Sequence, residues 1–264
     1  MKQKIIAAAI GTLGLMSSGS AFAISAGGVN FGAVGAFQHL ETTTVAETLV
    51  LAVGDTLTGY GQVNTVNGDL NYAGSDRLYF TFSYLTDSFS PTSVGFKNGT
   101  INFFKGANFN LQNQDSPTNL ATISAYTPWL TLKGHADTTG YDLAANGQLV
   151  GTNIVFTGGG LLDVVGGLAD VVALLDSNSE ADGLGGFADI TLTSSGSNSV
   201  LNVFDVQNGH AENCNVATGQ IAGEWCLAGS ADLRGKTNPV PEPETLVLLG
   251  AGLLGLSTMS RKKA

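Results

Sequence analysis

Short runs in which large apolar residues alternate with other residues recur along the chain and limit the folds open to it. In the clearest run, every second position from 78 to 84 is occupied by Leu78, Phe80, Phe82 and Tyr84. A period of two places such residues on one face of a β-strand. Further runs predict strands over Thr48–Val53, Thr56–Val66, Trp129–Lys133, Gln148–Thr157, Phe187–Thr193 and Val200–Val206. The chain is therefore expected to be all-β, an antiparallel β-sandwich or jelly-roll-like body.

Turn signals separate these runs. Asn98-Gly99 lies between the apolar pairs at 94/96 and 101/103, a pattern that predicts a hairpin turn. Asn-Gly also occurs at Asn67-Gly68, Asn146-Gly147 and Asn208-Gly209. Glycine makes up 36 of 264 residues, about twice its usual share of roughly 7%. The run at 161–175 is ambiguous between a helix and two strands joined at Gly166-Gly167, and its valines favour the strands.

The N-terminus has the three parts of a secretory signal peptide. Lys2 and Lys4 precede an apolar run from Ile5 to Met16, and Ala21 and Ala23 form an A-x-A cleavage site. We expect residues 1–23 to be removed during export by the Sec machinery, so that the mature chain begins at Ile24.

The C-terminus has three parts as well. Pro241, Glu242 and Pro243 form an extended segment, because proline fixes φ and removes a backbone donor. Residues 245–260 carry no charge, and the basic residues Arg261, Lys262 and Lys263 follow them. This order predicts a short hydrophobic helix whose basic end stays in the cytoplasm. Its 16 residues fall short of the roughly 20 of a full bilayer span, which favours a sorting signal over an ordinary membrane anchor.

This tail resembles the PEP-CTERM signal of exported proteins in Gram-negative bacteria. The resemblance implies that an exosortase processes the chain, that the tail anchors it in the inner membrane only during sorting, and that residues 239–264 form the signal. It also implies an outer-surface or extracellular-matrix protein that accompanies exopolysaccharide, floc or biofilm formation. The Gly/Asn/Thr-rich body is similar to flocculation-associated members. Residues 24–238 are then expected to form the extracellular β-sandwich domain.

The charge of that domain excludes one class of function. Between Ile24 and Val240 there are 6 basic and 19 acidic residues, a net charge of −13. Such a surface repels nucleic acid and attracts divalent cations. We therefore expect no nucleic-acid partner.

The two cysteines lie close together in the exported part. Cys214 and Cys226 are expected to form a disulfide, the usual state of such a pair in an oxidising compartment.

No catalytic motif is evident in the sequence. The three histidines lie far apart with no H-E-x-x-H pattern, and no G-x-S-x-G is present. We expect a non-enzymatic protein. The alternative is an exported carbohydrate-binding or carbohydrate-active hydrolase protein, since aromatic residues such as Trp129 and Trp225 could stack on sugars. Their other interpretation is core packing.

One acidic segment has the ligand types that calcium prefers. Oxygen-bearing side chains occur at Asp176, Asn178, Glu180, Asp182 and Asp189, with Gly183 able to form a sharp turn. Calcium takes six to eight oxygen ligands, often from a flexible loop. The hypothesis is one weak Ca²⁺ site, and the alternative is a solvated acidic loop.

Overall fold

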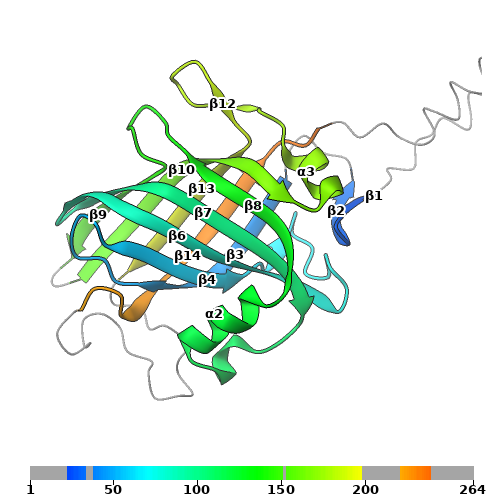
Figure 1. Cartoon of the computed structure of the whole chain (residues 1–264), viewed down its shortest axis with the longest axis horizontal. Coiled ribbons are helices and arrows are strands. Elements are labelled where there is room, and N and C mark those ends of the chain that lie inside the picture. Colours follow the sequence, from blue (N-terminus) through cyan, green and yellow to red (C-terminus); the bar gives the residue numbers. More distant parts are fainter. Residues whose placement is uncertain (1–22, 34–37, 151–152, 198–220, 239–264) are drawn as a thin grey trace, which may run out of the picture.

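The computed structural model describes residues 23–33, 38–150, 153–197 and 221–238. Ten strands form one antiparallel sheet, which confirms the all-β prediction (Figure 1). These strands are β3 (Gln38–Thr48), β4 (Thr56–Gln62), β5 (Thr65–Val66), β6 (Asp76–Ser90), β7 (Ser93–Ala107), β8 (Thr127–His135), β9 (Leu143–Val150), β10 (Asn153–Gly167), β13 (Ile190–Ser197) and β14 (Trp225–Gly235).

Eight of the strands close into a ring, which we call the barrel. Each of β3, β4, β6, β7, β8, β10, β13 and β14 pairs with the next, and β14 pairs back with β3. Strand β9 continues β8 along the barrel, because it pairs with both β7 and β10. A single sheet closed on itself has no two facing sheets, so the expected sandwich or jelly roll is not confirmed.

The barrel interior is filled by the alternating apolar residues. Leu78, Phe80, Phe82 and Tyr84 of β6 all belong to the central core, and each is less than 10% exposed. The predicted strand at 78–84 is thus confirmed with its apolar row facing inward.

One end of the barrel is closed by two short strands and a helix. These are β1 (Ala23–Ala26), β2 (Val29–Ala33) and α3 (Ala169–Leu175) (Figure 1). The ring of Phe31 stacks on that of Trp129, with centroids 6.2 Å apart. The backbone N–H of Gly27 donates to Asp170 Oδ2 over 2.7 Å, which joins the β1–β2 turn to α3.

Helix α2 (Ser116–Ser124) covers part of the outer surface, following the short 3₁₀ turn η1 (Leu111–Asn113). The hydroxyl of Tyr60 in β4 lies 2.9 Å from Ser116 Oγ. The same Tyr60 hydroxyl accepts a hydrogen bond from Asn119 Nδ2 over 3.0 Å. Tyr79 packs in the same outer cluster and is fully buried. The outward face of β6 is therefore also apolar at the point that α2 covers.

Two of the expected Asn-Gly turns lie inside strands. Asn98 has φ of +55° and lies within β7, where three residue steps on β7 match two on β6. This is a β-bulge, and the β6–β7 hairpin turns instead at residues 91–92. Asn146-Gly147 lies in β9, paired with β7 and β10. Asn67-Gly68 does form a turn, with φ of +52° and +80°.

Other strand predictions were wrong in part. The run at 161–175 begins as β10 and continues as helix α3, not as a second strand. The strand expected at Thr48–Val53 is a loop after Thr48, the last residue of β3. Strand β3 itself was not anticipated. The run Val200–Val206 and the turn Asn208-Gly209 lie outside the described residues.

Candidate functional site

The barrel encloses a cavity of about 230 Å³. It lies toward the end that carries the β6–β7 turn, away from the end closed by α3. Its lining is mainly apolar and comes from strands all round the barrel, including Leu57, Phe82, Phe96, Ile101, Leu143 and Leu192. Leu51 and Phe89 line the same cavity and are 39% and 41% exposed. An apolar surface thus extends from the cavity to the outside of the described barrel.

Glycines on β4 shape the aromatic side of the cavity. Gly59 and Gly61 alternate with outward-facing Tyr60, so they lie on the inner face. A Cβ atom at Gly61 would lie 2.6 Å from Phe80 Cζ, and one at Gly59 would overlap the ring of Phe82. The tips of the two rings therefore occupy the space that side chains at Gly59 and Gly61 would fill.

Glu47 supplies the only carboxyl group in the cavity lining of the described residues. It lies on β3, paired with Leu227 on one side and Gly59 on the other. No hydrogen bond or ion pair joins its side chain to any described residue. Burial raises the pKa of Glu47 to about 7. By surface area the residue is of intermediate burial, and it lines the cavity.

Glu47 was not among the predicted site residues, although the sequence contains a signal for it. Val45, Glu47 and Leu49 occupy alternate positions, and all three line the cavity. A glutamate in an inward row of a strand is a charged residue at a buried position. Such residues are rare in cores unless they are paired or functional.

Tyr84 is a second polar group at the cavity. Its ring contributes to the lining and lies against Gly99, where a Cβ atom would overlap it. The hydroxyl is buried and has no hydrogen-bond partner among the described residues. Burial, aided by the charge of Asp142, raises the pKa of Tyr84 above its ordinary value. Tyr84 therefore stays neutral.

The residues of the predicted calcium loop lie on and beside the hairpin of β11 (Glu180–Ala181) and β12 (Phe187–Ala188). Asp176 Oδ1 accepts a hydrogen bond from Asn178 Nδ2, and Asp189 accepts the backbone N–H groups of Asn178 and Val164. Glu180 Oε1 lies 3.9 Å from Lys236 Nζ. Among the described residues, Asp176, Glu180, Asp182 and Asp189 do not form a group with ligand atoms within 4.8 Å of one another. The calcium site remains a prediction.

Asp182 pairs with a histidine instead. His135 Nδ1 lies 2.9 Å from Asp163 Oδ2, and His135 Nε2 lies 3.2 Å from Asp182 Oδ2. The hydrogen bond to Asp163 raises the pKa of His135, against the effect of burial. The backbone N–H of Leu184 lowers the pKa of Asp182, and the bond to His135 adds to this. Both ring nitrogens of His135 are thus occupied.

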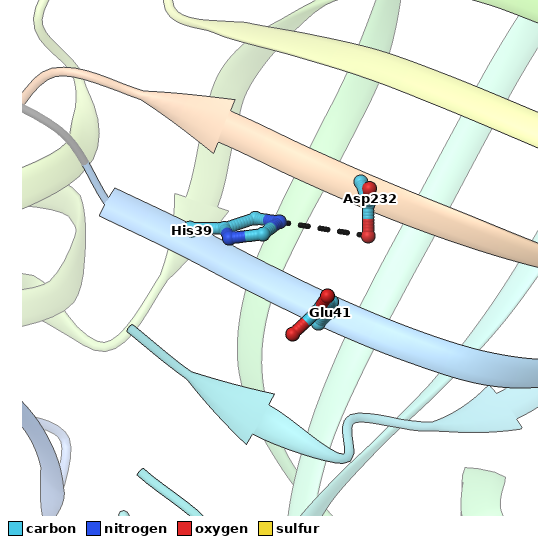
Figure 2. A group of neighbouring side chains, drawn as sticks. All are labelled: His39, Glu41 and Asp232. Carbon is cyan, nitrogen blue, oxygen red and sulfur yellow. Dashed lines mark ion pairs between the residues drawn. The ribbon is translucent and has the colours of Figure 1, made fainter. Parts of the chain in front are cut away.

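A second histidine lies between carboxylates on the outer face of the barrel. His39 and Glu41 are two residues apart on β3, and Asp232 lies on the neighbouring strand β14 (Figure 2). The ligand atoms of these three side chains all lie within 4.8 Å of one another. None of these three residues was predicted to form a site, because β3 was not anticipated as a strand.

Several predicted residues fall outside the described part of the chain. These are the signal peptide with Ala21, the whole C-terminal tail from residue 239, and Cys214. Ala23 begins β1. Cys226 lies buried in β14 and is not a free thiol, while its pairing with Cys214 remains a prediction. In the described ranges, no helix has both the length and the apolar character needed to cross a membrane.

Comparison with known proteins identifies the C-terminal tail. Residues 239–263 match the family model described as the PEP-CTERM protein-sorting motif. This stretch includes Pro241, Glu242, Pro243 and the basic residues at 261–263. No curated protein and no solved structure matches the chain. The protein therefore carries the C-terminal sorting signal of exosortase substrates, and this signal indicates an exported protein.

Proposed function

We propose that the exported body is a non-enzymatic binding protein that holds an apolar molecule inside its barrel. The place of action that we propose is the outer surface or the extracellular matrix, in association with exopolysaccharide, floc or biofilm material. The sorting signal supports export, and the cavity supports binding.

The observation that carries this proposal is the apolar cavity with the single carboxyl group of Glu47. Ligand sites are typically apolar concavities with a few polar groups that fix orientation. At about 230 Å³ the cavity lies below the roughly 300–1,000 Å³ of sites for drug-sized ligands. We infer a slender ligand, with an alkyl or aryl body and a hydroxyl or amino group that reaches Glu47.

The alternative functions receive less support from this cavity. Sugar hydroxyls need many polar partners, and the lining here is mainly apolar. Glycoside hydrolysis uses two carboxyl groups, whereas Glu47 is the only one lining the cavity in the described residues. Trp129 is fully buried in the core and so is not a sugar platform. A matrix role through weak Ca²⁺ bridging at the acidic hairpin is kept as a secondary proposal.

A displacement assay tests the binding function. The full-length protein is titrated with the neutral apolar fluorophore N-phenyl-1-naphthylamine, and 1-decanol then competes for the site. We expect saturable binding of one fluorophore per chain. The variant Ala145→Phe fills the cavity and should abolish binding, because Ala145 is buried in the lining. The control Ala144→Phe makes the same change on the outward side of β9 and should leave binding intact. Equal binding by both variants would contradict the proposal.

A further inference from the structure

A cluster of one histidine and two carboxylates lies on the outer wall of the barrel, separate from the cavity. Antiparallel pairing places Asp232 of β14 directly opposite Glu41 of β3, and His39 lies two residues before Glu41. Residues two apart on a strand share a face, and so do paired residues on neighbouring strands. Their inward neighbour Leu40 belongs to the core, so the three side chains face outward (Figure 2).

The contact between His39 and Asp232 has the spacing of two metal ligands. His39 Nε2 lies 3.5 Å from Asp232 Oδ1, which is long for a hydrogen bond to a ring nitrogen. His39 Nε2 is buried and has no hydrogen-bond partner among the described residues. Two ligands bound to one tetrahedral ion at about 2.0–2.1 Å lie roughly 3.4 Å apart. An ion between these two atoms would satisfy the nitrogen with little movement.

The neighbours of the cluster favour a cation at this point. Glu41 Oε2 accepts a hydrogen bond from Thr65 Oγ1 over 2.9 Å, which orients the carboxylate. Arg234 lies on the same face, and its guanidinium is 3.9 Å from Asp232 Oδ2. The other carboxylate oxygen of Asp232, Oδ1, is the one that faces His39. The side chain of Arg234 is 60% exposed, so it can turn away into solvent. Two carboxylates therefore outweigh one mobile positive charge.

We propose that His39, Glu41 and Asp232 bind one divalent transition-metal ion, with Zn²⁺ as the probe. One imidazole and two carboxylates give Zn²⁺ three protein ligands and leave a fourth position for water. A histidine ligand favours zinc and its neighbours in the transition series over Ca²⁺ and Mg²⁺, which prefer oxygen ligands only. The side chains of His39 and Asp232 are 27% and 33% exposed, so the cluster lies at the protein surface although the Nε2 atom itself is buried.

Calorimetric titration of the untagged full-length protein with Zn²⁺ tests this site. We expect one ion per chain, and His39→Gln and Asp232→Asn should each weaken the affinity by at least about tenfold. The matched control is His135→Gln, because His135 also lies between two carboxylates but has both ring nitrogens in hydrogen bonds. The control should keep the affinity of the natural chain.

Three results would overturn the site. They are an affinity unchanged in both His39→Gln and Asp232→Asn, a loss of Zn²⁺ only in His135→Gln, and no Zn²⁺ uptake by the natural chain. Circular dichroism of each variant checks that the barrel is folded. As a second readout, Co²⁺ bound at the site should give visible absorption bands that disappear in Asp232→Asn, the variant closest in shape to the natural chain.

Discussion

Glu47 on β3 is paired with Gly59 on β4, so the carboxyl group in the cavity lies beside a residue that has no side chain. The ring of Phe82 covers Gly59 from the interior. A buried carboxyl group with no partner is costly to ionise, because ionisation there loses the hydration that water would provide. The barrel thus keeps a polar group at a position where an apolar residue would be more stable, and this is the pattern of a binding site.

Glu47 should make the protein less stable as pH rises. Its pKa of about 7 in the folded state exceeds its ordinary value of 4.5, so the folded state binds more protons between these two values. Stability therefore falls as pH rises through this window, by at most about 3 kcal/mol. Glu47→Gln removes this pH dependence. In urea denaturation, the free energy of unfolding of Glu47→Gln should therefore exceed that of the natural chain by more at pH 8 than at pH 5. An equal gain at both values would show that burial of the charge is not the cause.

Ligand binding should depend on the same group. An amine such as decylamine pairs with the ionised carboxylate, so its affinity should increase as pH rises through about 7, whereas the affinity of 1-decanol should change less. Glu47→Gln should remove the difference between the two ligands. Displacement of the fluorophore at pH 6 and pH 8 measures this. A pH effect on decylamine that persists in Glu47→Gln would place the amino group elsewhere.

Gly59 should not tolerate a methyl group. Gly59→Ala places a methyl group against the ring of Phe82 and 2.7 Å from the backbone oxygen of Ala46, and overpacking of this kind costs roughly 1–3 kcal/mol. Gly159→Ala in β10 is the control, because its methyl group would meet only Leu192 O, at 3.6 Å. Urea denaturation should show a lower free energy of unfolding for Gly59→Ala. For the control, the free energy of unfolding should change by no more than about 0.5 kcal/mol. Equal effects would mean that close packing around Gly59 is not what excludes a side chain there.

The alternation of apolar and other residues along the chain predicted individual strands of this fold. It could not predict that the sheet closes into a barrel. The row at 78–84 identified β6 and its inward face. The pairing of β14 with β3 depends on segments nearly 200 residues apart, and no local pattern encodes it. Asn98-Gly99 was predicted to be a turn because asparagine tolerates the positive φ of a type I′ turn, and here the same conformation of Asn98 occurs in a bulge. Gly99 is required at this point for another reason, since a Cβ atom there would overlap the ring of Tyr84.

The candidate sites were missed for a related reason. Glu47, His39 and Asp232 can be assigned to sites only when β3 and β14 are known to be neighbouring strands. The alternation of β3 is hard to recognise in the sequence because the strand contains three consecutive threonines. The acidic hairpin, in contrast, was visible as a cluster in the sequence. The structure shows that Asp182 and Asp189 are engaged by His135 and by backbone N–H groups. These hydrogen bonds compete with a cation for the same oxygens.

His135 should stabilise the fold in its charged form. Its pKa is raised by Asp163 and Asp182, so its contribution is complete below its ordinary pKa and is lost as pH rises through the folded value. Asp163→Asn should therefore destabilise the protein more at pH 5.5 than at pH 8.5, by about 1 kcal/mol or less because the pair is partly exposed. Urea denaturation at the two pH values measures the difference. A larger loss at pH 8.5 would contradict the raised pKa.

The sorting signal predicts the mass of the exported chain. We expect the protein recovered from outside the cells to lack the apolar segment at 245–260, and a variant with alanine at Pro241 and Pro243 to stay with the membrane at greater mass. Intact mass measurement of both fractions tests this. An exported chain that still ends at Ala264 would show that the signal is not processed.

Native mass spectrometry of the exported protein, isolated without detergent, tests the binding proposal most directly. We predict one noncovalent small-molecule adduct per chain, released by organic solvent and absent from Ala145→Phe, with Ala144→Phe keeping it. A natural chain that carries no adduct and takes up neither 1-decanol nor decylamine, or an adduct that Ala145→Phe retains, would contradict a binding role for the barrel cavity.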